Sequence, residues 1–259
     1  MFIEDTNFLD QHFLIDQDVK SQFLNAIDVD NNDTIVEIGP GKGTITKLLV
    51  PYAKKVTVIE LDKRLAPYLE SIPNINIIYG SCLEMEIPAC DKIVTSLPYS
   101  ITEPFIYKLI NTDFKELIMI CGKRYADSVM KQEESKLSLL TNLFFEMTYI
   151  MDIEPNSFRP SPRVMSSLVT LKPLSENKLS KSNLIMRYLF SYRLLKVKNA
   201  LKEILIKTDK ITQREAKNLI AQLNIKEDIS NKKFDELNNE EVKTLKKDIE
   251  EYFNARSKI

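Results

Sequence analysis

The sequence predicts an α/β protein, in which a doubly wound, mostly parallel sheet is followed by a small all-α C-terminal domain. From residue 34 to about residue 172, short β-branched or aliphatic runs alternate with stretches of helical periodicity, as in a parallel sheet covered by helices on both faces. Beyond residue 178 only helical periodicity remains. Three of the five glycines stand at alternate positions, 39, 41 and 43, directly after the first β-branched run.

Hydrophobic periodicity indicates the elements in order. A first amphipathic helix is expected before residue 28, with an apolar side made of Val19, Phe23, Leu24 and Ile27. The expected strands span 34–38, 56–60, 75–79, 91–95, 115–121, about 147–153 and 164–172. The helices expected between them span 44–53, 63–71, 102–111 and, as one long helix, about 123–145.

A polar, proline-containing stretch at 172–178 interrupts this periodicity and marks a domain boundary. At 259 residues the chain can hold one full α/β domain and a smaller one. We therefore assign residues 1–175 to the first domain and residues 176–259 to a helical domain.

The helical domain should contain three main helices. One covers about 182–206, and a second begins at Thr212, where Glu215 three residues later completes a capping box. The last helix has a single apolar face, formed by Val242, Leu245, Ile249 and Phe253.

The composition is that of a globular protein, with 44% hydrophobic and 28% charged residues. The sequence shows neither a basic leader followed by an apolar stretch nor an apolar run long enough to cross a bilayer, so we expect no membrane association. Cys82, Cys90 and Cys121 lack the spacing of metal ligands, and His12 is the single histidine, so we expect no metal site. Because an odd number of cysteines also argues against a disulfide framework, we expect a cytoplasmic protein.

Charge is unevenly distributed along a chain whose formal net charge is −1. Residues 1–119 contain ten Lys or Arg against eighteen Asp or Glu, whereas residues 181–217 contain ten basic residues against three acidic ones. A basic segment in a near-neutral chain indicates a contact region for a polyanion such as a nucleic acid. The alternative is a solvated helix face, which is the commoner meaning of a charge run.

The glycines lie where a buried strand ends and a helix begins, so backbone N–H groups there can approach a ligand without a Cβ in the way. A dinucleotide fingerprint would need glycine at position 44, where Thr44 stands. The pattern that begins at Glu37 is instead E-x-G-x-G-x-G, which resembles motif I of the S-adenosylmethionine (SAM) dependent methyltransferases. An ordinary glycine-rich turn is the alternative.

Two further groups are expected at the same edge of the sheet. Glu60 ends the second strand about twenty residues after the glycines, where a carboxylate can accept from both ribose hydroxyls of a nucleoside. Ser81 and Cys82 follow the third strand. Because ligands of open α/β sheets bind at the carboxyl ends of the strands, these residues and the glycines predict a nucleoside pocket.

Ser96-Leu97-Pro98-Tyr99 follows the fourth strand and has the residue types needed to hold an exocyclic amine. The Ser96 hydroxyl oxygen and the Leu97 carbonyl can accept the two amine hydrogens. Pro98 stiffens the turn, and the Tyr99 ring offers a stacking face for a flipped purine. Holding both hydrogens moves the nitrogen towards sp³ geometry, so a sulfonium methyl group can be attacked without a strong general base. The alternative is a simple turn with a packed aromatic ring.

Five motifs together resemble the small-subunit ribosomal RNA adenine N6,N6-dimethyltransferases of the KsgA type, which are relatives of the Erm methylases. The motifs are Gln11–Asp16, the glycine turn, Glu60, Ser96–Tyr99 and Phe158–Pro162 with the pattern F-x-P-x-P. The resemblance is strong over about residues 8–173 and weaker beyond. It implies a Rossmann-like catalytic domain that uses SAM, transfer of two methyl groups to N6 of adenines in a ribosomal RNA hairpin loop, and a helical domain that contacts RNA. We expect a monomer acting on ribosomal RNA or the assembling small subunit.

The resemblance also implies roles for individual residues, with the target adenine stacked between Tyr99 and Phe158. The catalytic set is Ser96, Leu97, Pro98, Tyr99 and Phe158. The cofactor-binding set is His12, Leu14, Glu37, Gly39, Gly41, Glu60, Ser81, Cys82 and Ser96. The RNA-binding set is Arg159, Arg163, Arg187, Arg193, Lys196 and Lys198.

The chain departs from the family pattern at four places. His12 replaces an asparagine that contacts the cofactor, and Ser81 replaces an aspartate that accepts from the cofactor's adenine amine. Ser96 replaces the asparagine of N-L-P-Y and is shorter by one heavy atom. The basic helix F-S-x-R-R-K is reduced at residues 190–196. Loss of the charge-assisted bond at Ser81 corresponds to ~1.5–3 kcal/mol of cofactor affinity.

These departures leave three hypotheses. The first is an active RNA adenine-N6 methyltransferase. The second is an RNA-binding or ribosome-assembly protein with weak or no catalysis, and the third is a SAM enzyme with another acceptor. Titration with SAM separates the second from the others if no binding appears.

Overall fold

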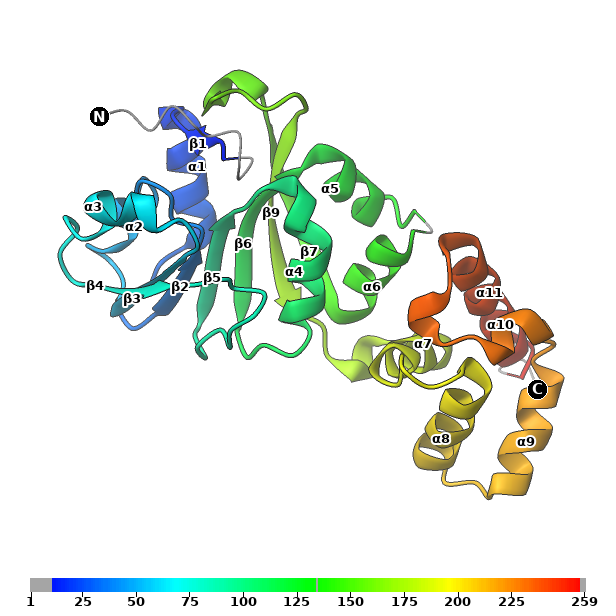
Figure 1. Ribbon diagram of the computed structural model, residues 1–259. Coiled ribbons are helices and arrows are strands. Elements are labelled where there is room, and N and C mark those ends of the chain that lie inside the picture. The colour runs from blue at the N-terminus through cyan, green and yellow to red at the C-terminus, as the bar shows by residue number, and fades with distance from the viewer. Residues whose placement is uncertain (1–10, 134, 257–259) are drawn as a thin grey trace. The chain divides into compact units, whose positions relative to one another are not determined.

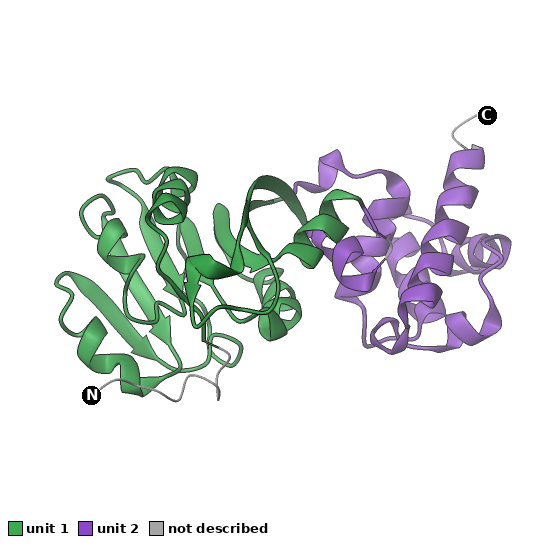
Figure 2. Ribbon diagram, turned by 90° about the horizontal axis from the view of Figure 1, so that it is seen from above, with its two compact units in different colours: residues 1–131, 145–173 green, residues 132–144, 174–259 purple. Residues whose placement is uncertain are grey.

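The computed structural model describes residues 11–133 and 135–256 of the chain (Figure 1). The chain folds into two compact units (Figure 2). The sheet unit comprises residues 1–131 and 145–173, and the helical unit comprises residues 132–144 and 174–259. Residues 132–144, which the sequence assigned to the first domain, therefore cluster with the C-terminal helices.

A seven-stranded Rossmann-like sheet forms the sheet unit, in the order β4-β3-β2-β5-β6-β9-β7. The first five strands of that order pair in parallel, and β9 runs antiparallel to both β6 and β7. The predicted doubly wound, mostly parallel sheet is confirmed. The strands are β2 (Thr34–Ile38), β3 (Lys55–Glu60), β4 (Ile75–Tyr79), β5 (Lys92–Ser96), β6 (Glu116–Gly122), β7 (Phe145–Ile153) and β9 (Ser166–Pro173).

The helices of the sheet unit follow the predicted order. They are α1 (Gln17–Ile27), α2 (Thr46–Leu49), the 3₁₀ turn Lys63–Leu65 with α3 (Ala66–Leu69), α4 (Thr102–Leu109) and α5 (Lys123–Met130). The helix predicted over 44–53 is much shorter than expected. Pro51 has no N–H group with which to extend α2, and the glycine turn occupies the residues before it.

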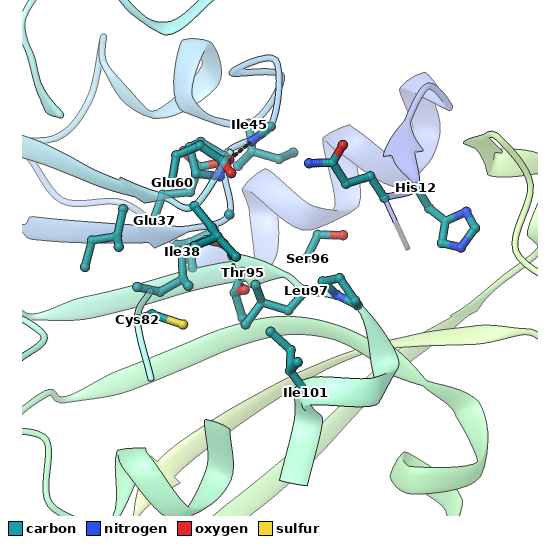
Figure 3. Close-up of a pocket in the computed structure, with 18 of the residues that line it drawn as sticks. His12, Glu37, Ile38, Ile45, Glu60, Cys82, Thr95, Ser96, Leu97 and Ile101 are labelled. Carbon is teal, nitrogen blue, oxygen red and sulfur yellow. Dashed lines mark hydrogen bonds between the residues drawn. The ribbon is translucent and has the colours of Figure 1, made fainter. Parts of the chain in front are cut away.

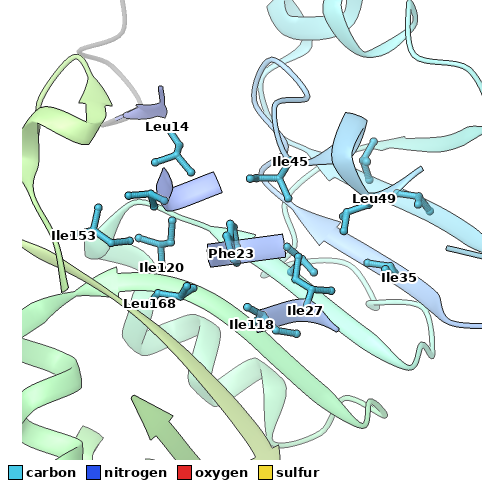
Figure 4. Packing of buried hydrophobic residues seen from close by; sticks show 14 of the residues in the cluster. Leu14, Phe23, Ile27, Ile35, Ile45, Leu49, Ile118, Ile120, Ile153 and Leu168 are labelled. Atoms are coloured by element: carbon cyan, nitrogen blue, oxygen red, sulfur yellow. The ribbon is translucent and has the colours of Figure 1, made fainter. Parts of the chain in front are cut away.

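α1 anchors the core beneath the site. Asp16 caps the helix by accepting from the N–H groups of Asp18 and Val19. Phe23 and Ile27 are fully buried, in one apolar cluster with residues of β2, β5, β6 and β9 (Figure 4). Burying a side chain of this size contributes ~1.5–3 kcal/mol, so truncation of Phe23 to alanine should cost ~3–5 kcal/mol.

The helical unit has its own core. Its helices are α6 (Lys136–Phe144), α7 (Lys181–Ser191), α8 (Val197–Asp209), α9 (Gln213–Gln222), α10 (Glu227–Asn231) and α11 (Asn239–Arg256). The Phe190 ring stands edge-on to Phe144 at 5.5 Å and to Phe234 at 6.4 Å between ring centroids. The capping box at Thr212 and Glu215 is confirmed.

The prediction of one long helix over 123–145 is wrong, because α5 and α6 are separate helices. Gln132 has a positive φ of 52°, which ends helical geometry. The Ser135 hydroxyl then accepts from the N–H group of Ser138 at 3.1 Å and starts α6.

The prediction of one helix over 182–206 is also wrong, because residues 192–195 form turns and bends between α7 and α8, and Lys196 forms an isolated β-bridge with Lys233. The N–H group of Val197 donates to the carbonyl of Lys232 at 2.8 Å instead of continuing a helix. The break turns the fully buried Val197 into the core and leaves Leu194 69% exposed.

None of the described helices combines the length and apolarity that a membrane crossing needs. The described residues also contain no group of three or more His, Cys, Asp or Glu side chains placed to bind a metal. Cys82, Cys90 and Cys121 are free thiols.

Candidate functional site

A cavity of about 410 Å³ opens at the carboxyl ends of β2, β3 and β5 (Figure 3). Here β2 lies between β3 and β5, so the cavity occupies the crevice where the strand order reverses. Its volume suits a small organic ligand. Every residue that the sequence assigned to cofactor binding or catalysis lines it: His12, Leu14, Glu37, Gly39, Gly41, Glu60, Ser81, Cys82, Ser96, Leu97, Pro98, Tyr99 and Phe158.

The glycine turn forms one wall of the cavity and contacts two other parts of it. Gly39 has a φ of +67°, and a Cβ there would lie 3.0 Å from the Leu97 side chain. Gly41 has a φ of +60°, and a Cβ there would lie 3.1 Å from the Phe13 ring. A side chain at either position would combine an unfavourable backbone conformation with crowding.

Glu60 ties the end of β3 to the glycine turn. Its Oε2 accepts from the N–H group of Gly41 at 3.0 Å, and its Oε1 accepts from the N–H group of Asp62 at 2.8 Å. Burial raises the pKa of Glu60, although these two hydrogen bonds act in the opposite direction. Each carboxylate oxygen can still accept a further hydrogen bond. This role in shaping the turn was not evident from the sequence.

Glu37 is only 4% exposed at the base of the turn. The hydroxyl of Thr46, the first residue of α2, donates to Glu37 Oε2 at 2.6 Å. Burial raises the pKa of Glu37 to about 7, the Thr46 bond opposes the shift, and the nearby charge of Glu60 adds to it. A carboxyl group with this pKa is partly protonated at neutral pH.

Ser81 and Cys82 form the wall after β4. The Ser81 hydroxyl oxygen accepts from the N–H group of Leu83 at 3.3 Å, so it already stabilises its own turn. Burial raises the pKa of the Cys82 thiol to about 11, so the side chain is a neutral, largely apolar surface. A serine hydroxyl engaged in this way offers a ligand fewer acceptor positions than an aspartate would.

β5 carries the loop Ser96–Tyr99 into the cavity. The hydroxyl of the preceding Thr95 donates to the carbonyl of Ile38 at 3.0 Å, which links the ends of β5 and β2. The Ser96 hydroxyl makes no hydrogen bond with any residue that the structure describes, and it lines the cavity (Figure 3). Tyr99 begins the 3₁₀ turn Tyr99–Ile101, and its hydroxyl is hydrogen-bonded to Oγ of Ser166.

Residues 11–16, the N-terminal strap, close the cavity together with the F-x-P-x-P segment. β1 (Phe13–Leu14) pairs antiparallel with β8 (Phe158–Arg159), so that Leu14 lies opposite the buried Phe158. His12 Nδ1 lies 2.8 Å from the carbonyl oxygen of Pro160. Two motifs that are distant in the sequence thus form one wall.

The cavity also contains residues that sequence reasoning did not select. Phe13 lies in the strap, and the Nζ atom of Lys42 in the glycine turn is 4.7 Å from its ring centroid. Leu61 lines the cavity beside Glu60 and is 57% exposed. Only their positions in the sequence could have identified these two residues as part of the cavity. Phe13 lies inside the motif Gln11–Asp16, and Leu61 directly follows Glu60 at the end of the second strand.

The predicted RNA-binding residues lie in both units. Arg159, the second residue of β8, and Arg163, which follows that strand, are exposed in the sheet unit. Lys196 and Lys198 are exposed at the start of α8, where Lys198 Nζ donates to Oδ1 of Asn231 at 2.6 Å. Their role in RNA binding remains a prediction.

Arg187 and Arg193 have contacts within the helical unit. Arg187 donates to the carbonyl of Leu174 at 2.7 Å, and its guanidinium lies 4.7 Å from the centroid of the Phe144 ring. Arg193 pairs with Asp235 at 3.2 Å. Both side chains therefore help to hold the helical unit together, whatever they contact besides.

A family model described as "Ribosomal RNA adenine dimethylase" matches residues 4–247. The chain belongs to this family. The predicted resemblance is therefore confirmed, and the match extends through most of the helical unit.

Curated relatives agree with membership in the ribosomal RNA adenine dimethylase family. A protein of Pyrococcus abyssi named "Probable ribosomal RNA small subunit methyltransferase A" is 32% identical over 249 residues, which cover 93% of this chain and 89% of the relative. A protein of the same name from Pyrococcus furiosus is 32% identical over 96% of this chain and 92% of its own length.

Solved structures show the same fold. A dimethyladenosine transferase from Plasmodium falciparum aligns with a TM-score of 0.63 at 22% identity, over 93% of this chain and 98% of the other. The 23S rRNA methyltransferase ErmE aligns with a TM-score of 0.60 at 19% identity, over 92% and 99%. The family fold is thus that of the Rossmann-like methyltransferases, with the helical region included.

Proposed function

We propose that this protein transfers methyl groups from SAM to N6 of adenine in the RNA of the small ribosomal subunit. One observation carries the proposal. A single cavity joins the residues expected to bind the cofactor to Ser96–Tyr99, the loop expected to hold the target amine. Membership in the ribosomal RNA adenine dimethylase family and the names of its relatives support this substrate class.

The chemistry of the cavity fits SAM as the cofactor. Glu60 can accept from the ribose hydroxyls, and Gly41 brings the turn close without a Cβ. Leu61 and Cys82 offer apolar surface to the adenine ring, and the acidic Glu37 and Glu60 suit a ligand with positive charge. When bound, SAM supplies a methyl group on a positively charged sulfur.

The loop after β5 would orient the target amine. The Ser96 hydroxyl oxygen, which has no partner among the described residues, and the Leu97 carbonyl accept the two amine hydrogens. Accepting both hydrogens directs the nitrogen lone pair away from the loop and into the cavity. The reaction then depends on position and on hydrogen bonds that strengthen as positive charge develops on the nitrogen.

Aromatic side chains would hold the base. Tyr99 and Phe158 line the same cavity from different elements, and stacking on such rings is worth ~1–3 kcal/mol per base. Arg159 in β8 and Arg163 after it would contact phosphates, as would the exposed Lys196 and Lys198 at the start of α8. The monomeric state, action on the assembling subunit and a cytoplasmic location remain predictions.

A second candidate is an RNA-binding protein with weak or no catalysis. Two observations favour it: the Ser81 hydroxyl is engaged by the N–H group of Leu83, and serine at position 96 has a shorter reach than asparagine. The names of the relatives favour the enzyme.

Two measurements test the proposal. We expect calorimetric titration to show SAM binding, and mass spectrometry of nucleosides to detect N6-methylated adenosine after small-subunit RNA is incubated with the protein and labelled SAM. SAM binding without methylation of any nucleoside would reject the proposal. Methylation of another nucleoside would favour a SAM enzyme with a different acceptor.

A further inference from the structure

Tyr99 is held by residues that lie outside its own loop. Its hydroxyl is hydrogen-bonded to Oγ of Ser166, the first residue of β9 and 67 positions further along the chain. Ser166 is fully buried and pairs with Gly122 at the end of β6 and with Ile153 at the end of β7. The tyrosine is therefore tied to the interior of the sheet.

The Tyr99 ring also lies near Gly122. Its φ of −62° and ψ of 134° are accessible to any residue, so the backbone does not require glycine. A Cβ at this position would lie 3.6 Å from Cγ and 3.8 Å from Cδ1 of Tyr99, which is van der Waals contact. The tyrosine ring thus lies close to the backbone of β6, next to the residue that pairs with Ser166.

Ser167, which follows Ser166 in β9, has a different hydrogen-bond partner. Ser167 is also fully buried, but its hydroxyl donates to Asp152 Oδ1 at 2.8 Å. Successive strand residues point to opposite faces of a sheet, so the two hydroxyls serve opposite faces. Ser166 bonds the tyrosine of the cavity, whereas Ser167 bonds a carboxylate that also pairs with Lys123 at 2.6 Å.

We propose that Ser166 is a positioning residue that fixes the orientation of the Tyr99 ring on which the target adenine stacks. The inference rests on the proposed function. A tyrosine side chain has two main rotatable bonds, and the hydroxyl bond to Ser166 at the far end of the ring limits rotation about them. A ring held in advance delivers the amine to the Ser96–Leu97 acceptors in one orientation, and such orientation contributes directly to rate.

The test compares wild type with Ser166→Ala, Tyr99→Phe and the double variant. Ser166→Ala removes one hydroxyl from a buried site. We expect kcat for methylation of small-subunit RNA to fall about tenfold, the equivalent of one ordinary hydrogen bond, while the Kd for SAM stays unchanged. Tyr99→Phe should lose as much, and the double variant no more than either single variant, because all three remove the same bond.

Ser167→Ala is the matched control. It removes an equally buried hydroxyl from the neighbouring position of β9. We expect it to lower the melting temperature without lowering kcat. An equal loss of kcat in Ser167→Ala and Ser166→Ala would mean that general weakening of β9 causes the effect, and would overturn the inference.

A purely structural role predicts a different pattern. If Ser166 only satisfies the Tyr99 hydroxyl, activity returns in the double variant, where no hydroxyl requires a partner. Such recovery, or an unchanged kcat in Ser166→Ala, would overturn the inference.

Base stacking can be followed without methyl transfer. We expect 2-aminopurine riboside, whose fluorescence is quenched by stacking, to be quenched less by Ser166→Ala than by wild type at equal protein concentration. Equal quenching would overturn the positioning role. Failure of wild type to methylate RNA would instead reject the proposed function, so the two failures are distinguishable.

Discussion

The two halves of the cavity are built differently. In the half formed by the glycine turn, the acidic side chains are held by internal donors: Thr46 for Glu37, and the N–H groups of Gly41 and Asp62 for Glu60. In the half formed by Ser96–Tyr99, the tyrosine is fixed, but the Ser96 hydroxyl bonds no described residue. The acids of the first half are oriented by donors of the protein, whereas the Ser96 hydroxyl of the second half has no bonding partner among the described residues. Such an acceptor favours catalysis because its bond can strengthen as the reaction proceeds.

The largest effect on SAM binding should come from a substitution in the glycine turn of the first half of the cavity. Gly41→Val places a branched side chain where even a Cβ alone would lie 3.1 Å from the Phe13 ring and where φ is +60°. We expect calorimetry to detect no SAM binding. Gly41→Ala should retain weak binding, since it adds only the Cβ near Phe13 to a backbone strain of ~1–2 kcal/mol, without the two further methyl groups of valine. Wild-type affinity in Gly41→Val would show that the turn does not face the cofactor.

The next effect concerns pH. Burial raises the pKa of Glu37 from 4.5 to about 7, so between these values the folded protein keeps a proton that the unfolded chain releases. Stability should therefore fall as pH rises through this window. Glu37→Gln removes the titration and can still accept from Thr46. Both proteins are measured without SAM. The free energy of unfolding of Glu37→Gln minus that of wild type should rise by about 3 kcal/mol from pH 4.5 to pH 7.5. Parallel urea-unfolding profiles across this range would refute the buried, partly protonated state.

A somewhat smaller effect is expected at Glu60. Glu60→Gln keeps the shape but places an NH₂ group against the N–H group of either Gly41 or Asp62. We expect SAM to bind roughly 10–100-fold more weakly, from a loss of ~1.5–3 kcal/mol. The exposed Glu86 provides the control, because Glu86→Gln removes the same charge away from the cavity lining. Equal losses in both variants would assign the effect to net charge.

The role of the second half of the cavity can be tested at Ser96. Ser96→Ala should lower kcat about tenfold and leave SAM and RNA affinity nearly unchanged, because the lost bond matters in the transition state. Ser96→Asn restores the family's usual residue and should raise kcat if reach is limiting. Nucleoside mass spectrometry measures both. If neither variant differs from wild type, Ser96 is not the acceptor.

The smallest effect should come from the helical unit. Reversing charge at the exposed Lys196 and Lys198 should weaken RNA binding and flatten its dependence on log salt by up to ~0.7–0.9 per lost phosphate contact. Lys247→Glu on α11 is the control, since this lysine is 71% exposed and pairs with Glu251. The same slope in all variants would mean that the start of α8 is a solvated surface.

The sequence determined the fold class and the place of the site. Strand runs, the glycine turn and Glu60 are local signals, and parallel strands necessarily bring their carboxyl ends to one edge, so the cavity was predictable before any contact was known. The family match confirms the family resemblance that the five motifs predicted. Local signals sufficed because each of these features depends on residues close in the chain.

Tertiary structure alone decided the helix breaks and the supports of the site. The gap before α8 depends on the bond between Val197 and Lys232, and the Tyr99 hydroxyl is bonded to Ser166, which lies 67 positions further along the chain. The N-terminal strap pairs with β8, although the paired residues lie far apart in the sequence. Periodicity records which face of an element is apolar, but it carries no information about which distant donor or acceptor will meet that face once the chain has folded.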